Sequence, residues 1–188
     1  MNTLFPIFVK AEQLHTLIVG GGYVGLEKAT ALLGNAPDAR VTLIAPEIRE
    51  ELYGLARLHP RLELIKEPYH RLYLAGKDLV IVGTNDKEVN RQVQIDCKVE
   101  RILVNVADTP ALCDFYLSSV VKKGDLKIAI STNGKSPTFA KRFREVLEDI
   151  LPDSLQETLD NLTAIRMKLK GDFVQKMEKL NEITNILK

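Results

Sequence analysis

A glycine-rich hexapeptide near the start of the chain could bind the phosphates of a nucleotide. Residues 20–25 read Gly-Gly-Gly-Tyr-Val-Gly and match the pattern G-x-G-x-x-G. In this pattern Gly20 permits a tight turn, Gly22 lets the backbone approach a pyrophosphate, and Gly25 lets a helix pack closely on a strand. Unpaired N–H groups at the start of that helix would bind the phosphate oxygens. The alternative is a glycine turn with a purely structural role.

The choice between NAD and NADP depends on residues about 20 positions further on, where an acid that binds the ribose is expected. The nearest acid is Glu47, directly after Pro46, and Arg49 follows two residues later. Glu47 would favour NAD, whereas Arg49 would suit the 2′-phosphate of NADP. We expect NAD. Glu47 could instead be an acid at the start of a helix between positions 46 and 55.

Further polar residues follow later apolar runs, where ligands gather in an open α/β sheet. Thr84 and Asn85 follow one run, and residues 105–110, beginning with Asn105, end the next. Within the latter, Asp108 has the chemistry of a general base or a metal contact. It could equally be a turn residue before Pro110.

The sequence gives little support for a metal site or for a catalytic nucleophile. The three histidines, His15, His59 and His70, do not form a spaced set of metal ligands. No G-x-S-x-G nucleophile motif occurs. We therefore expect no protein-held metal site.

The elements that must position these residues alternate along the first 110 positions. Apolar runs at 15–19, 41–45, 61–66, 79–83 and 102–106 predict buried parallel strands. Helical patterns at 26–33 and 86–97 lie between them. Strands that alternate with helices predict an α/β fold with a doubly wound parallel sheet of the Rossmann type. Residues 4–9 predict an edge strand or a covering segment.

After this alternation the pattern changes. Residues 115–121 and 126–130 predict a β-hairpin. Ser136 and Pro137 predict the start of a helix that runs to about position 151. Two amphipathic helices follow, at 153–170 and 172–187, interrupted by Gly171. We predict an NAD-binding domain at 1–112, a dimerisation and substrate-binding region at 113–151, and a helical region at 152–188.

Composition limits the function classes. The 188 residues carry a net charge of +1 and include two cysteines, which argues against bulk nucleic-acid binding and against a disulfide framework. We find neither a bilayer-spanning run nor a signal peptide, and expect a cytoplasmic protein. Residues 117–144 hold seven basic residues against a single acid. This segment predicts an anionic partner or a solvated face.

These residues together resemble the precorrin-2 dehydrogenase and sirohydrochlorin ferrochelatase family, the dehydrogenase–chelatase module of siroheme synthase. The resemblance covers about residues 1–152, in order and with matching spacing. It rests on Phe5-Pro6-Ile7-Phe8, residues 17–22 with Val24 and Lys28, residues 41–48, Thr84-Asn85-Asp86 with Asn90, Asn105-Val106-Ala107-Asp108, Phe115, Ser119 and residues 131–137.

The resemblance implies NAD-dependent oxidation of precorrin-2 to sirohydrochlorin, followed by insertion of Fe²⁺ as a substrate to give siroheme. The catalytic aspartate of the family falls on Asp108. The implied cofactor contacts are Gly20, Gly22, Tyr23, Val24, Gly25, Pro46, Glu47, Thr84, Asn85 and Asn105. A tetrapyrrole edged with carboxylates would explain the basic segment, and its predicted contacts are Ser131, Lys135, Ser136, Lys141 and Arg144.

A homodimer is implied as well. Two alternatives stay open at this point: a dehydrogenase without chelatase activity, and a non-enzymatic Rossmann protein that senses the redox state through its nucleotide. A carboxylate requirement at Asp108 and a tetrapyrrole site would distinguish the enzyme from the sensor.

Overall fold

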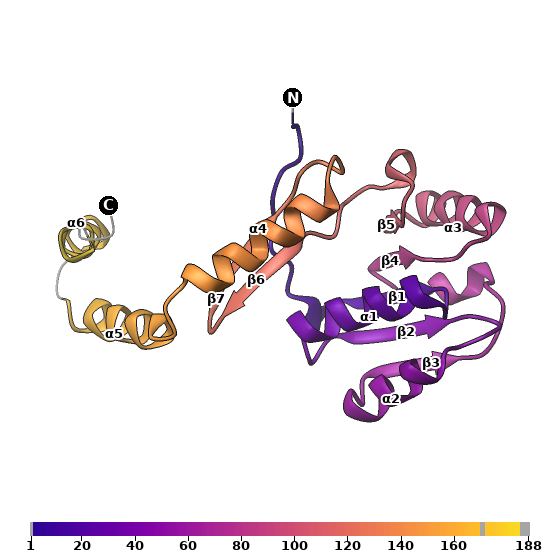
Figure 1. Ribbon diagram of the computed structural model, residues 1–188, viewed down its shortest axis with the longest axis horizontal. Coiled ribbons are helices and arrows are strands. Elements are labelled where there is room, and N and C mark those ends of the chain that lie inside the picture. Colours follow the sequence, from indigo (N-terminus) through magenta and orange to yellow (C-terminus); the bar gives the residue numbers. More distant parts are fainter. Residues whose placement is uncertain (1, 170–171, 185–188) are drawn as a thin grey trace. The chain divides into compact units, whose positions relative to one another are not determined.

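The chain divides into two units, Met1–Leu117 and Ser118–Lys188. The structure, a computed structural model, describes residues 2–169 and 172–184 (Figure 1). The predicted features at Lys170, Gly171 and Leu187 lie outside the described residues. Among the described residues, none of the helices is long and apolar enough to cross a bilayer.

The first unit contains the predicted parallel sheet. Its strands are β1 (His15–Val19), β2 (Arg40–Ile44), β3 (Leu62–Ile65), β4 (Leu79–Val82) and β5 (Leu103–Val106). They are all parallel and are arranged in the order β3-β2-β1-β4-β5. From β1 the chain adds β2 and β3 on one side of the sheet, and then adds β4 and β5 on the other side. The switch point therefore lies between β1 and β4, which is where ligands bind in folds of this kind. The predicted doubly wound α/β class is confirmed.

Helices cover both faces of this sheet because successive strand residues point to opposite sides. On one face Ile18 and Leu43 pack with Leu33 of α1 (Tyr23–Asn35) and Leu52 of α2 (Glu50–Leu58). The other face packs against α3 (Lys87–Glu100) and the 3-10 turn η2 (Arg71–Leu74). There Leu17, Val80 and Val104 contact a cluster that includes Val93 and Cys97. The hydrophobic core therefore lies on both sides of the central strands.

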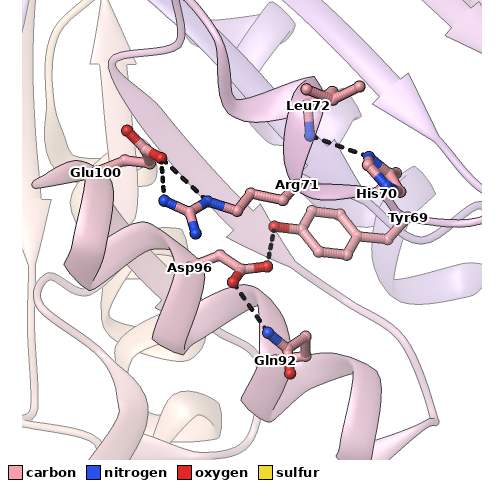
Figure 2. A network of polar contacts seen from close by, with 7 residues as sticks. All are labelled: Tyr69, His70, Arg71, Leu72, Gln92, Asp96 and Glu100. Carbon is pink, nitrogen blue, oxygen red and sulfur yellow. Dashed lines mark hydrogen bonds and ion pairs between the residues drawn. The ribbon is translucent and has the colours of Figure 1, made fainter.

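A polar network attaches the connection between β3 and β4 to α3, as Figure 2 shows. The buried Asp96 carboxylate accepts hydrogen bonds from Tyr69 and from Gln92, both at 2.9 Å. The guanidinium of Arg71 donates to Glu100 at 2.6 and 3.1 Å. Burial, followed by the nearby Asp96, raises the pKa of the Tyr69 phenol, so the phenol keeps the proton that it donates. This network fixes α3, whose first residue follows one of the predicted ligand-binding loops.

Of the two alternatives for residues 4–9, an edge strand or a covering segment, the edge strand is wrong. Residues 2–10 form neither strand nor helix, and Phe5, Ile7 and Phe8 are largely exposed. The apolar pattern of this segment resembles a strand, but Pro6 lacks the N–H that a sheet ladder requires. In the hairpin, the first strand begins at Ser119 rather than at Phe115. The reason is that the Phe115 carbonyl accepts a hydrogen bond from Asn105 in the first unit.

The second unit starts with the predicted hairpin, β6 (Ser119–Lys123) and β7 (Leu126–Ile130), which pair antiparallel. Helix α4 (Pro137–Ile150) packs on β6 and buries Ala140, while Val121 of β6 is fully buried. The Ser136 hydroxyl accepts the Phe139 N–H at 3.1 Å and caps α4 as predicted. Helices α5 (Leu155–Lys168) and α6 (Phe173–Ile183) follow. The hairpin and the first part of α4 carry the basic segment.

Candidate functional site

The glycine loop joins β1 to α1 at the carboxyl edge of the sheet. Gly20 has φ +124°, and a Cβ there would lie 2.6 Å from the carbonyl oxygen of Gly83. A Cβ on Gly25 would lie 1.9 Å from the Gly20 carbonyl oxygen. Both positions therefore require glycine for the packing of the protein itself. A Cβ on Gly22 meets nothing within 4 Å, so the space beside Gly22 is open to a ligand.

The start of α1 suits a phosphate. Gly22 is the N-cap of this helix and has no side chain that could pair with the N–H groups of the first turn. These N–H groups and the helix dipole would attract a pyrophosphate. Tyr23 is exposed and Val24 half-buried at this end, while Gly25 lies inside the helix. The residues present thus fit a dinucleotide.

The loop after β2 comes close to the glycine loop. The N–H of Arg49 donates to the Gly21 carbonyl at 3.0 Å, and the Arg49 guanidinium lies 3.7 Å from the centroid of the Tyr23 ring. Glu51 accepts from Arg49 at 2.5 Å. Mainly through this hydrogen bond, Glu51 raises the pKa of Arg49. The sequence does not predict the Arg49–Glu51 pair on Tyr23, because nothing local shows that the loop after β2 lies against the start of α1.

Glu47 lies outside helix α2. The helix begins at Glu50, so its first-turn acids are Glu50 and Glu51. Pro46 and Glu47 are exposed in the turn before it. The interpretation of Glu47 as an acid of the helix start is therefore wrong, and its contact with ribose stays a prediction.

The loop after β4 is held by its own polar groups. The Thr84 hydroxyl accepts the Asp86 N–H at 3.1 Å and lies 2.5 Å from the side-chain oxygen of the buried Asn90. Asp86 caps α3 by accepting from the N–H groups of Glu88 and Val89, as the sequence predicts. Thr84 thus has a role within the protein, whereas Asn85 is exposed beside it.

Asp108 lies in the loop after β5, at the same edge of the sheet. Its backbone is left-handed, with φ +55°, a conformation that non-glycine residues seldom adopt outside functional or turn positions. Among the described residues its exposed carboxylate has no hydrogen-bond or ion-pair partner. The following 3-10 turn η3 (Pro110–Leu112) receives no side-chain cap. The Asp108 carboxylate therefore accepts, from the described residues, none of the backbone hydrogen bonds by which an aspartate usually stabilises a turn. It is available to accept a proton from a substrate.

The side chain of Asn105, a predicted cofactor contact, bonds to another part of the protein. Its side chain is buried and donates to the Phe115 carbonyl at 2.8 Å. It is also 3.5 Å from the sulfur of Cys113. This amide thus attaches the segment after η3 to strand β5.

The predicted substrate residues belong to the second unit. Ser131 accepts the N–H of Asn133 at 3.2 Å within the loop before α4, and Arg144 lies 3.7 Å from Glu148. Lys135 and Lys141 are exposed and form no ion pair with any residue that the structure describes. Together with the capping residue Ser136, these residues gather on the loop and on the first two turns of α4.

Two cavities lie at the opposite, amino edge of the sheet. They have volumes of about 390 and 310 Å³ and share His15, Arg40 and Arg61. The glycine loop and the start of α1, which suit a nucleotide, lie at the carboxyl edge and line neither cavity. In residues 2–169 and 172–184, no group of three or more His, Cys, Asp or Glu side chains could hold a metal ion.

Comparisons with known proteins agree with this arrangement. A family model described as "Putative NAD(P)-binding" matches residues 7–119, and one described as "Sirohaem biosynthesis protein central" matches residues 123–150. The chain is 43% identical over 152 residues to the siroheme synthase of Psychrobacter sp. (strain PRwf-1), covering 81% of this chain and 30% of that protein. Identity to the siroheme synthase of Nitrosomonas europaea is 32%, covering 90% of this chain and 35% of the relative. The chain thus spans about a third of the length of these relatives.

A solved structure extends the comparison over both units. SirC, described as a precorrin-2 dehydrogenase, superposes with a TM-score of 0.75 at 26% identity, covering 96% of this chain and 89% of that one. The two family models match consecutive parts of the chain, as the sequence resemblance implied. The chain therefore belongs to the putative NAD(P)-binding family, whose model covers residues 7–119, and it carries next to this match the central region of sirohaem biosynthesis proteins.

Proposed function

We propose that this protein oxidises precorrin-2 to sirohydrochlorin with NAD as the hydride acceptor. The observation that carries the proposal is the unpartnered, left-handed Asp108 at the same sheet edge as the open glycine loop. The similarity to SirC and to the siroheme synthases supports the choice of substrate.

The reaction removes two hydrogens from the tetrapyrrole. When bound, NAD⁺ supplies a hydride acceptor. The remaining hydrogen leaves as a proton, and we assign its acceptance to the Asp108 carboxylate. The exposed lysines on the loop and α4 would bind the acetate and propionate groups at the edge of the substrate.

Insertion of Fe²⁺ into sirohydrochlorin is a second proposed step. The tetrapyrrole brings its own nitrogen ligands, so the protein need only accept the pyrrole protons as the metal enters. Asp108 has the chemistry for this, because a free carboxylate can act as a general base in either step. A dehydrogenase without this step remains the alternative.

The assay that tests the function is spectrophotometric. Precorrin-2 and NAD are added to the protein, and NADH formation is followed together with the tetrapyrrole absorbance; Fe²⁺ or Co²⁺ is then added. The dehydrogenase proposal requires NADH in proportion to sirohydrochlorin. Absence of NADH formation would support the sensor instead, and a spectrum unchanged by the metals would restrict the protein to the first step.

The pairing of Arg49 supports NAD over NADP. Glu51 occupies the guanidinium that a 2′-phosphate would need, and its own negative charge would repel that phosphate. We expect Glu51→Gln to raise the kcat/KM ratio of NADP to NAD by up to about tenfold, because the change frees the Arg49 guanidinium and removes a negative charge beside the 2′-phosphate. Steady-state kinetics with both cofactors measures this ratio.

The matched control is Glu50→Gln, because Glu50 is exposed beside Glu51 and has no partner among the described side chains. It should leave the ratio unchanged. If Glu47→Gln raises the ratio and Glu51→Gln does not, Glu47 is the residue that faces the ribose.

The homodimer is a further part of the proposal. Four exposed side chains of α4 recur at helical spacing along one stripe: Phe139, Phe143, Val146 and Ile150. The first two rings stack with centroids 5.9 Å apart. An apolar stripe of this kind is typical of a surface that a second subunit covers.

We expect Phe143→Asp to convert the dimer to a monomer, because it would place a charge in the middle of a buried interface. Sedimentation at micromolar concentration measures the mass, with Thr138→Asp on the exposed start of the same helix as control. A wild-type protein that sediments as a monomer contradicts the proposed dimer.

The cysteines bear on the location of the protein. Cys97 and Cys113 are both free, which supports the proposal of a cytoplasmic location.

A further inference from the structure

The outer edge of β5 is closed by side chains instead of a neighbouring strand. The N–H groups of Val104 and Val106 point away from β4 and need other partners. Val104 donates to the Asp114 carboxylate at 3.1 Å, and its carbonyl accepts the Asp114 N–H at 2.8 Å. Val106 donates to the sulfur of Cys113 at 3.2 Å, and its carbonyl lies 3.1 Å from the same sulfur. The Cys113 thiol thus pairs with both backbone groups of the last β5 residue.

The same thiol also reaches the far side of the loop. Its sulfur lies 3.4 Å from the Thr109 carbonyl oxygen, and the Thr109 N–H donates to the Val106 carbonyl at 3.2 Å. Residues 106 and 109, on either side of Asp108, are therefore both attached to Cys113. Since the Asp108 side chain has no partner of its own, its position depends on the backbone on either side.

The thiol is suited to this double role in its protonated form. Burial raises the pKa of Cys113 above its ordinary value, so the S–H remains able to donate to a carbonyl while the sulfur accepts an N–H. Val106 is 1% exposed, and water cannot replace these contacts without opening the loop. Removal of the thiol would leave the buried Val106 N–H without its partner, and would leave the Val106 carbonyl with the Thr109 N–H alone.

We propose that Cys113 is a positioning residue, which sets the place of the Asp108 carboxylate through the backbone of Val106 and Thr109. The inference rests on the proposed function, in which Asp108 accepts the substrate proton. Cys113 itself touches neither the substrate nor the cofactor. Its effect should therefore appear in the catalytic step and not in nucleotide binding.

The test compares Cys113→Ala with Cys113→Ser. Alanine lacks both hydrogen-bonding functions, and we expect kcat with precorrin-2 to fall by about tenfold or more, because small misplacements of reacting groups are costly. The KM for NAD should stay within about twofold, since the glycine loop is untouched. Serine keeps a donor and an acceptor and should recover most of kcat.

Two further measurements separate positioning from general destabilisation. In the cofactor-free full-length protein, hydrogen exchange of the Val106 amide should be faster in Cys113→Ala than in wild type, and Cys113→Ser should restore it. The control is Cys97→Ala, which empties space in the core beneath α3 and should lower thermal stability without changing kcat. A loss of kcat in this control equal to that in Cys113→Ala would show an effect of stability alone and overturn the proposal.

The outcomes distinguish this inference from the proposed function. A wild-type kcat in Cys113→Ala overturns the positioning role, whatever the exchange rates show. If wild type does not oxidise precorrin-2, or if Asp108→Asn is fully active, the proposed function or its base fails. In that case the hydrogen-exchange rate of the Val106 amide alone shows whether Cys113 fixes the loop. Equal rates in wild type and Cys113→Ala would overturn this structural role too.

Discussion

Replacing Asp108 by asparagine is expected to lower the turnover of precorrin-2 by about 10²–10⁴-fold, the usual effect of a lost acid–base group. The carboxylate has no partner among the described residues and stabilises nothing in the fold. Asparagine has nearly the same shape and tolerates the left-handed backbone at φ +55°. Only the proton acceptor is removed, so the thermal midpoint and the affinity for NAD should remain close to those of wild type.

Alanine is a less informative substitution at this position. It would remove the carboxylate but would also place an ordinary residue in the left-handed region, at a cost of about 1–2 kcal/mol. A difference in stability between Asp108→Ala and Asp108→Asn would report this backbone strain. Asp38→Asn is the matched control, because Asp38 is an exposed acid of the same unit whose carboxylate has no partner in the described structure.

The same variant shows whether one carboxylate serves both proposed steps. Dehydrogenation is followed by NADH absorbance, and metal insertion is followed separately with sirohydrochlorin and Co²⁺. Loss of both activities would support a shared base. Loss of dehydrogenation alone would confine Asp108 to the first step, and full retention of both would return it to a turn residue before Pro110.

Gly22→Val should abolish most NAD binding while the protein still folds. We expect the Kd for NAD to rise by about 100-fold or more, equivalent to the loss of about two charge-assisted hydrogen bonds to the pyrophosphate. The fold should survive because a Cβ at this position meets no atom within 4 Å. Calorimetric titration gives the affinity, and circular dichroism with thermal unfolding checks the fold.

Two other glycines serve as comparisons. Gly34→Val makes the same substitution near the end of the same helix, again without an atom within 4 Å, and should leave NAD binding unchanged. Gly25→Val should fail to fold correctly, because its Cβ would lie 1.9 Å from the Gly20 carbonyl oxygen. An unchanged NAD titration for Gly22→Val would refute the assignment of this loop to the pyrophosphate.

Local patterns in the sequence determined much of this fold. A strand that ends in glycines and leads into a helix is a local signal, and so are the caps at Asp86 and Ser136, because each cap bonds to N–H groups two or three residues away. The alternation of buried runs with helices was enough to predict a parallel sheet. The same kind of signal left an edge strand open for residues 4–9, and this alternative is wrong, since hydrophobicity alone does not show whether a partner strand exists.

Only the tertiary structure decided what lies beside the candidate site. The strand order, the packing of Gly83 against Gly20, and the stacking of Arg49 on Tyr23 join residues more than 20 positions apart, and no local pattern encodes such pairs. The Cys113 thiol likewise returns to the edge of β5 and contacts the backbone of Val106, in the loop that holds the left-handed Asp108. The physical reason is that hydrogen-bond partners of an edge strand are set by where the chain folds back, and not by the residues of the strand itself.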